Sequence, residues 1–339
     1  PIQPKKHSFE FLRENAHLRV RTTTFGAIMR IRSKLSYATH KFFQNENFQY
    51  VNTPIITSND AEGAGEMFRV TTLDPKSPPT KNSNVDFKKD FFSKKTHLTV
   101  SGQLEAESYA LGLGKVYTFG PTFRAENSNT TRHLSEFWMI EPEMAFFNLE
   151  DNMNLAEKFV KYILNFILDH CMDDLFYLEE RLYNEEKNKP KNERNGMKLI
   201  EKLKFIVNNK FERISYSFAF EILKNCSHNK KKKFEFLVRD WGMDLQSEHE
   251  RYLVERHFKK PVVIFNYPSK SKAFYMRLND DQTTVAAMDI LFPGIGEIIG
   301  GSQREERLEI LKKRMNQFDV SNKDLWWYTE LRKFGTVPH

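Results

Sequence analysis

Apolar and polar positions alternate between residues 116 and 147, a pattern that predicts two antiparallel strands over 116–123 and 137–147. A polar loop over 126–135 joins them. The loop and its edges carry six ionisable side chains: Arg124, Glu126, Arg132, His133, Glu136 and Glu141. Such groups at the end of an apolar hairpin are costly to desolvate unless they meet a charged ligand. Taken alone, the pattern leaves open a solvated hairpin with surface ion pairs and an anion-binding site.

The same reading predicts a mixed chain of helices and short strands. Helical spacing predicts a helix over 24–45, which a strand interrupted by Pro54 follows, and polar residues predict a solvent loop over 73–90. A strand ending at Ser101-Gly102 then leads into a helix. The remaining expected elements are helices over 149–180, 197–209, 214–226 and 241–258 and strands over 261–267 and 272–279. An apolar strand that presents Asp289 follows, then a Gly-rich turn, and then a second strand and helix start framed by Glu297 and Arg304.

Composition excludes several classes of protein. The 339 residues are 40% hydrophobic and 29% charged, as in a soluble globular protein of one large domain or two smaller ones. No apolar run approaches the ~18 residues that a membrane span needs, and the N-terminus has no apolar signal core. The two cysteines, Cys171 and Cys226, exclude a disulfide framework and oppose structural zinc, so an intracellular protein is expected. The net charge of +7 favours a polyanionic partner only weakly.

Four segments together resemble the class II aminoacyl-tRNA synthetases, in the form of the bacterial asparaginyl enzymes. F-R-A-E at 123–126, T-x-R-H-L-x-E-F at 130–137 and E-P-E at 141–143 resemble motif 2. The helix and strand over 24–57 resemble motif 1, S-G-Q-L at 101–104 resembles the amino-acid-binding segment, and 293–304 is close to a signature of asparaginyl enzymes. The resemblance implies an α+β fold, an antiparallel sheet flanked by helices. By contrast, G-L-G-K at 112–115 lacks the spacing of a phosphate loop.

The resemblance also implies roles for individual residues, with Arg124 and Glu297 as the catalytic pair. It implies ATP contacts by Arg124, Glu126, Arg132, His133, Phe137 and Glu297, asparagine contacts by Glu62, Ser101, Gln103, Glu141 and Arg304, and Mg²⁺ binding by Glu297 and Asp289. Arg304 would donate to the carbonyl of the asparagine side chain, and Glu141 would accept from its amide. An aspartate would place a second anion against Glu141, which predicts its rejection.

The implied organisation is a linker over 1–20 and a catalytic domain over 21–339, with a charged insertion around 181–211. The anticodon-binding OB-fold and motif 3 of the family are expected to be absent from this chain. The expected partners are tRNA(Asn), asparagine, ATP and a second copy bound through 24–57, with no membrane. The expected location is cytoplasmic or an organelle of bacterial descent, plastid or mitochondrion. Two alternatives stay open: an aspartate-amidating asparagine synthetase, and a non-catalytic RNA-binding paralogue.

Overall fold

The computed structural model describes residues 2–59, 67–127, 134–187, 197–320 and 325–339. The chain forms two compact units. The first comprises Pro1–Asn45, Met153–Phe265 and Met288–Gly300, and the second comprises Glu46–Asn152, Asn266–Ala287 and Gly301–His339. No helix in the described part of the chain is long and apolar enough to cross a membrane.

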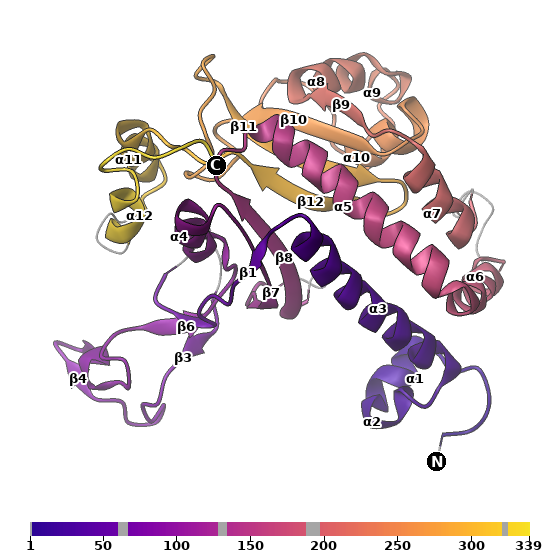
Figure 1. The fold of residues 1–339 in the computed structure, drawn as a ribbon, viewed down its shortest axis with the longest axis horizontal. Coiled ribbons are helices and arrows are strands. Elements are labelled where there is room, and N and C mark those ends of the chain that lie inside the picture. The colour runs from indigo at the N-terminus through magenta and orange to yellow at the C-terminus, as the bar shows by residue number, and fades with distance from the viewer. Residues whose placement is uncertain (1, 60–66, 128–133, 188–196, 321–324) are drawn as a thin grey trace. The chain divides into compact units, whose positions relative to one another are not determined.

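The expected hairpin is the central element of the second unit (Figure 1). Strand β7 (Lys115–Phe123) pairs antiparallel with β8 (Glu136–Met144), and β1 (Gln49–Tyr50) pairs parallel with β7. The hairpin prediction is confirmed, although the second strand ends at Met144. Helix α4 (Gln103–Leu113) packs on this sheet through small residues against Val116, and it ends at Gly114, whose φ of 88° favours glycine.

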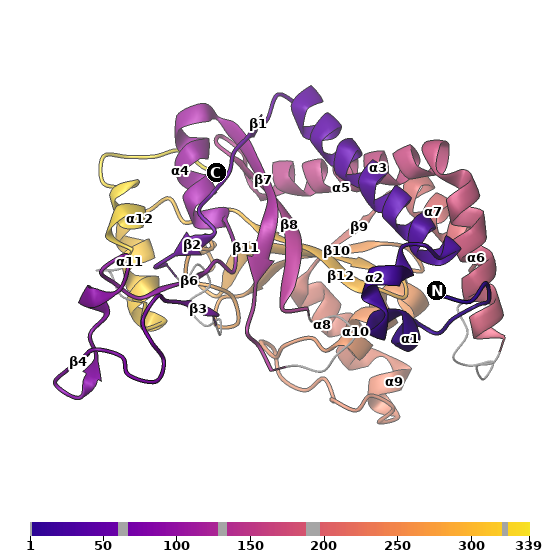
Figure 2. The ribbon, with the colours of Figure 1, turned by 90° about the horizontal axis from the view of Figure 1, so that it is seen from below.

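A second small sheet and two C-terminal helices complete this unit. Strands β2 (Ile56–Thr57) and β3 (Arg69–Val70) both pair antiparallel with β6 (Thr96–Leu98). Helices α11 (Leu308–Gln317) and α12 (Trp326–Glu330) lie beside each other (Figure 2) and pack into an apolar core. The core comprises Val100, Leu104, Phe274, Tyr275, Leu311, Met315, Leu325 and Tyr328.

One prediction in this unit is confirmed with added detail and one is wrong. The solvent loop expected over 73–90 is exposed or partly exposed except at Asp90, and it contains a small hairpin, β4 (Thr80–Lys81) and β5 (Asn84–Val85), and the 3₁₀ turn η1 (Phe87–Lys89). The supposed strand over 272–279 forms only isolated bridges. The carbonyls at its start and just before it are bound by a side chain: the guanidinium of Arg314 donates to the oxygens of Ser269, Lys272, Ala273 and Phe274 at 3.0–3.3 Å.

The first unit combines helices with a four-stranded sheet of order β12-β11-β10-β9. Helix α3 (Thr23–Asn45) confirms the expected helix, and it packs beside α5 and α6 (Figure 2). The single helix expected over 149–180 is instead two helices, α5 (Leu149–His170) and α6 (Met172–Glu186), which are separated at Cys171. The sheet contains β9 (Glu212–Ser215), β10 (Val262–Pro268), β11 (Thr284–Phe292) and β12 (Gly296–Ser302).

Shorter helices fill the rest of the first unit. The expected linker over 1–20 holds two of them, and the helix expected over 241–258 begins only at Ser247 and ends in a π-helical turn. These helices are α1 (Phe9–Glu14), α2 (Ala16–Arg19), α7 (Leu199–Asn208), α8 (Tyr216–Asn225), α9 (Ser227–Lys230), α10 (Ser247–Arg251) and η3 (Tyr252–His257). The observed fold agrees with the expected class, antiparallel sheets flanked by helices.

Candidate active site

Glu141 belongs to β8, and its side chain contacts the turn that connects β6 to α4. Its Oε1 accepts a hydrogen bond from the Ser101 hydroxyl at 2.5 Å, and its Oε2 accepts from the Gly102 N–H at 3.2 Å and from the Thr118 hydroxyl at 2.9 Å. Thr118 stands directly opposite Glu141 in the hairpin register. The approach is close, because a Cβ on Gly102 would lie 2.3 Å from the Thr53 Oγ1 and 3.4 Å from Oε2 of Glu141. The carboxylate is therefore held in one orientation.

The turn before α4 supplies two further expected contacts. Ser101 is buried, and its hydroxyl accepts from the Gln103 N–H at 3.1 Å while donating to Glu141. The side-chain nitrogen of Gln103 is buried and has no hydrogen-bond partner among the described residues, so it can donate to a ligand. Burial raises the pKa of Glu105 next to this turn, and the charge of Glu141 adds to the effect.

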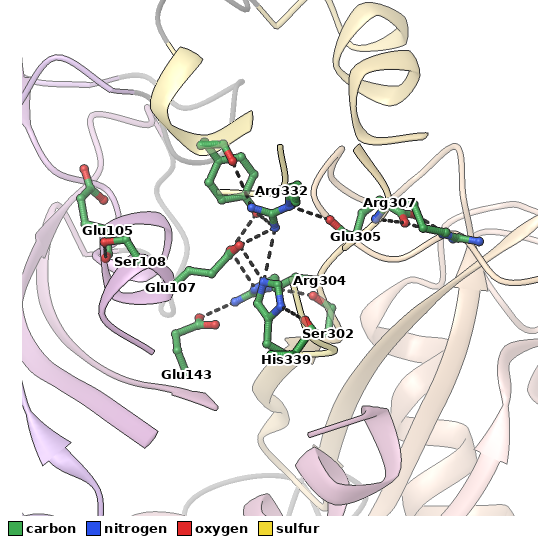
Figure 3. A network of polar contacts seen from close by, with 12 residues as sticks. Glu105, Glu107, Ser108, Glu143, Ser302, Arg304, Glu305, Arg307, Arg332 and His339 are labelled. Carbon is green, nitrogen blue, oxygen red and sulfur yellow. Dashed lines mark hydrogen bonds and ion pairs between the residues drawn. The ribbon is translucent and has the colours of Figure 1, made fainter. Parts of the chain in front are cut away.

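Arg304 is buried between carboxylates in the second unit (Figure 3). Its Nη2 donates to Oε1 of Glu143 at 2.5 Å and its Nη1 donates to the Ser302 hydroxyl at 2.7 Å. On the other side, its Nε lies 3.8 Å from Oε2 of Glu107, which is an ion pair but too long for a hydrogen bond. That Nε has no hydrogen-bond partner among the described residues.

The sequence predicts Glu141 as the acid that acts together with Arg304, and the structure adds a direct partner, Glu143. The two glutamates are two residues apart on β8, so their side chains lie on the same face of the strand, about 7 Å apart along it. Burial raises the pKa of Glu143, and the attraction of Arg304 opposes that effect. The carboxylates of Glu143 and Glu107 raise the pKa of Arg304, against its burial, so the guanidinium keeps its charge.

The ATP-site prediction is partly covered by the structure. The guanidinium carbon of Arg124 lies 5.5 Å from the ring centroid of Phe137, so the two expected ATP contacts are neighbours. The Arg124 N–H donates to the Ser135 carbonyl at 3.0 Å, which continues the hairpin pairing toward the loop. Glu126 is exposed beside them. Three predicted contacts, Glu62, Arg132 and His133, lie outside the described residues.

Two acids of the first unit converge on a glycine that follows them in the chain. A Cβ on Gly300 would lie 3.1 Å from Oε1 of Glu297 and 3.5 Å from Oδ1 of Asp289. Both carboxylate oxygens thus border the same small space. Two carboxylates fit Mg²⁺, which keeps several waters and takes its other ligands from phosphate. The described residues contain no cluster of three or more acids, histidines or cysteines that could hold a metal by themselves.

Several buried residues around Arg304 were not predicted from the sequence. They are Glu107, Glu143, Tyr328, Arg332 and His339. Two signals were available in the pattern: Glu143 follows Glu141 at strand spacing, and Glu107 lies on the apolar face of its helix, where a lone charge needs a partner. Neither signal identifies the partner.

Comparison with known proteins agrees with this fold. The family model of class II tRNA synthetases (D, K and N) matches residues 8–339. The chain therefore belongs to the class II tRNA synthetases of this group.

Within that group the similarity is to asparaginyl enzymes. The chain is 59% identical to an asparagine–tRNA ligase of Cytophaga hutchinsonii over 340 residues, covering all of this chain and 69% of the relative. It is 57% identical to that of Myxococcus xanthus, with the same coverage. A crystal structure of asparaginyl-tRNA synthetase from Pyrococcus horikoshii, complexed with asparaginyl-adenylate, matches with a TM-score of 0.79 and 32% identity, covering 100% of this chain and 67% of that one. These matches confirm the resemblance to asparaginyl-tRNA synthetases.

Proposed function

We propose that this chain activates asparagine with ATP and transfers it to tRNA(Asn). The observation that carries the proposal is the arrangement on β8, where Glu141 and Glu143, the partner of Arg304, share one face of the strand. This arrangement presents a carboxylate acceptor and a guanidinium donor at neighbouring positions. An asparagine side chain has one amide donor group and one carbonyl acceptor, so it can satisfy both. The identity to asparagine–tRNA ligases over the whole chain supports the same function.

Specificity follows from the charge of Glu141. The carboxylate accepts from an asparagine amide, whereas an aspartate side chain would bring a second anion against it. Ser101, Gly102 and Thr118 hold Glu141 in place, so it cannot turn away from that repulsion without losing three hydrogen bonds. Gln103 would donate to the substrate through the buried nitrogen that lacks a partner among the described residues.

Arg124 is proposed to act on the reacting groups. Its planar guanidinium can donate to the asparagine carboxylate and to the α-phosphate of ATP at the same time, which screens the repulsion between the two anions. The carboxylate oxygen then attacks the α-phosphorus, forming asparaginyl-adenylate and releasing pyrophosphate. Phe137, which lies next to Arg124, would stack on the adenine, and Glu126, Arg132 and His133 would contact ATP from the loop.

Glu297 and Asp289 are proposed to hold Mg²⁺ between their converging carboxylates at Gly300. A bound Mg²⁺ would neutralise the phosphate oxygens during the displacement. Glu62 would face the α-ammonium group of asparagine. In the second step the terminal ribose hydroxyl of tRNA(Asn) attacks the mixed anhydride and takes the asparaginyl group.

A homodimer through 24–57 is also proposed. The segment divides between the two units at Asn45, and each part leaves apolar side chains at the surface: Met29 and Tyr37 in the first unit and Ile55 and Ile56 in the second are 42–58% exposed. Exposed apolar side chains along one segment favour an association surface. Sedimentation of the protein should give the mass of a dimer, and a concentration-independent monomer would contradict this. The reaction requires tRNA, so the proposed location is the cytoplasm or an organelle that translates.

Asparagine-dependent ATP–pyrophosphate exchange tests the function. The protein should catalyse exchange with asparagine and much more slowly with aspartate. Glu141→Gln should lose most of this selectivity, because the amide removes the repulsion of aspartate while keeping the shape. Glu309→Gln, which changes an exposed glutamate outside the site, is the control and should behave as the wild type.

Three outcomes would count against the proposal. Exchange with aspartate but not asparagine would favour the aspartate-amidating alternative. Absence of exchange together with ATP binding would favour a non-catalytic paralogue. Unchanged selectivity in Glu141→Gln would remove Glu141 from the recognition of the side chain.

A further inference from the structure

A buried network centred on Glu107 lies next to Arg304 (Figure 3). The Glu107 carboxylate is fully buried on α4. Its Oε1 accepts from Nη2 of Arg332 and contacts Nε2 of His339 at 2.8 Å, and its Oε2 accepts from the Tyr328 hydroxyl at 2.7 Å. All four residues belong to the second unit. The carboxylate is therefore fixed by three partners before it meets Arg304.

The network continues to Arg304 through side chain and backbone. Glu107 Oε2 lies 3.8 Å from the Arg304 Nε, and the Arg304 N–H donates to the His339 carbonyl at 2.8 Å. Glu143 binds the opposite end of the guanidinium. Arg304 thus lies between two carboxylates, and because Glu107 also pairs with Arg332, two carboxylates balance two guanidinium groups.

We propose that Glu107 is a specificity-determining residue that acts through Arg304, a role that rests on the proposed function. Glu107 and Glu143 together balance the charges of Arg304 and Arg332, so the Arg304 guanidinium meets the substrate as a hydrogen-bond donor with no net charge left to neutralise. An asparagine carbonyl needs only such a donor. An aspartate carboxylate needs an uncompensated cation, which this site does not offer. Glu107 thereby disfavours aspartate indirectly, by compensating the charge of Arg304, whereas Glu141 disfavours it directly, by repelling its carboxylate.

The ionisation of the network supports this role. Burial alone would raise the pKa of Glu107, but Arg332, His339 and Arg304 outweigh it and lower the pKa to about 2. Glu107 is therefore an anion at neutral pH. Arg332 also donates to the carbonyl and hydroxyl of Tyr328 and to the Glu305 carbonyl, which holds its guanidinium in place beside Glu107.

The test compares asparagine with aspartate in the exchange assay, using Glu107→Gln. Removal of one buried negative charge should make the site more favourable to aspartate, so the ratio of kcat/KM for asparagine over aspartate should fall by roughly tenfold or more. Glu107→Asp keeps the charge and should retain most of the ratio. Tyr328→Phe removes one neutral hydrogen bond to Glu107 but leaves its charge, so the ratio should stay unchanged.

A purely structural role of Glu107 predicts a different result. The Gln variant would then lose activity toward both amino acids equally, and an unchanged ratio would overturn the inference. If Glu107→Gln does not fold, Arg332→Gln, which removes the cation paired with Glu107 and leaves its full charge to act on Arg304, should raise the ratio, and an unchanged ratio would overturn the inference. Lack of asparagine-dependent exchange by the wild type would refute the proposed function itself, whereas wild-type selectivity with an unaltered variant ratio refutes only the role of Glu107.

Discussion

Replacing Glu107 by glutamine should make stability less sensitive to acid. The carboxylate has its pKa lowered from the ordinary 4.5 to about 2, which corresponds to about 3 kcal/mol of stability at pH 7. The pKa is lower in the folded state, so this stability is fully present above about pH 4.5 and is lost as the pH falls toward 2. About 1 kcal/mol of it should already be lost at pH 3.5. Removing the anion also leaves Arg332 buried without its main partner.

The assay is urea unfolding of wild type and Glu107→Gln between pH 3.5 and pH 7 at constant ionic strength. Burial raises the pKa of Glu143, so that carboxylate changes stability in the opposite sense, and comparison of the two proteins removes most of its contribution. The difference in unfolding free energy should be about 3 kcal/mol at pH 7 and should shrink by about 1 kcal/mol at pH 3.5. A difference that stays constant over this range would show that Glu107 does not titrate as the network requires.

Three further substitutions test other parts of the site. Gly102→Ala would place a Cβ 2.3 Å from the Thr53 Oγ1, so it should raise the KM for asparagine at least tenfold and cost about 1–3 kcal/mol of stability; unchanged kinetics would contradict the close packing. Gly300→Ala would press on the Glu297 carboxylate at 3.1 Å, and it should raise the requirement for Mg²⁺ in pyrophosphate exchange with little change in melting temperature. Asp90→Asn should speed proteolysis within 73–95 without altering asparagine activation, because Asp90 accepts four hydrogen bonds there; equal cleavage rates would refute this anchoring role.

The parts of this protein that the sequence predicts well are those with local causes. The β7–β8 hairpin follows from alternation, and the turn before α4 follows from Ser101-Gly102 between a strand and a helix. The first part of the strand expected over 272–279 fails for a non-local reason, since Arg314 from a later helix binds the carbonyls of residues 272–274, and the rest pairs only through isolated bridges. The break between α5 and α6 at Cys171 could not be predicted either, because no proline or glycine marks it in the sequence.

The partners of Glu107 could not be predicted because they come from distant parts of the chain. Tyr328 and Arg332 follow Glu107 by 221 and 225 residues, and no local pattern pairs them. The resemblance to asparaginyl enzymes directs attention to Glu141, which is proposed to accept from the substrate amide. The resemblance gives no reason to consider Glu107, the carboxylate that helps to compensate the charge of Arg304.

Stability alone is a poor explanation for this network. Burying two carboxylates and two guanidinium groups carries a large desolvation cost, and well-packed apolar side chains of similar volume often stabilise a protein as well or better. The apolar core beside it, around Leu104 and Tyr328, offers such a packing environment. A synthetase that separates an amide from a carboxylate nevertheless needs an arginine whose charge is already satisfied, since an uncompensated one would select the anion. The two effects are separable, because selectivity depends on the charge of Glu107, whereas packing depends on its shape, which glutamine preserves.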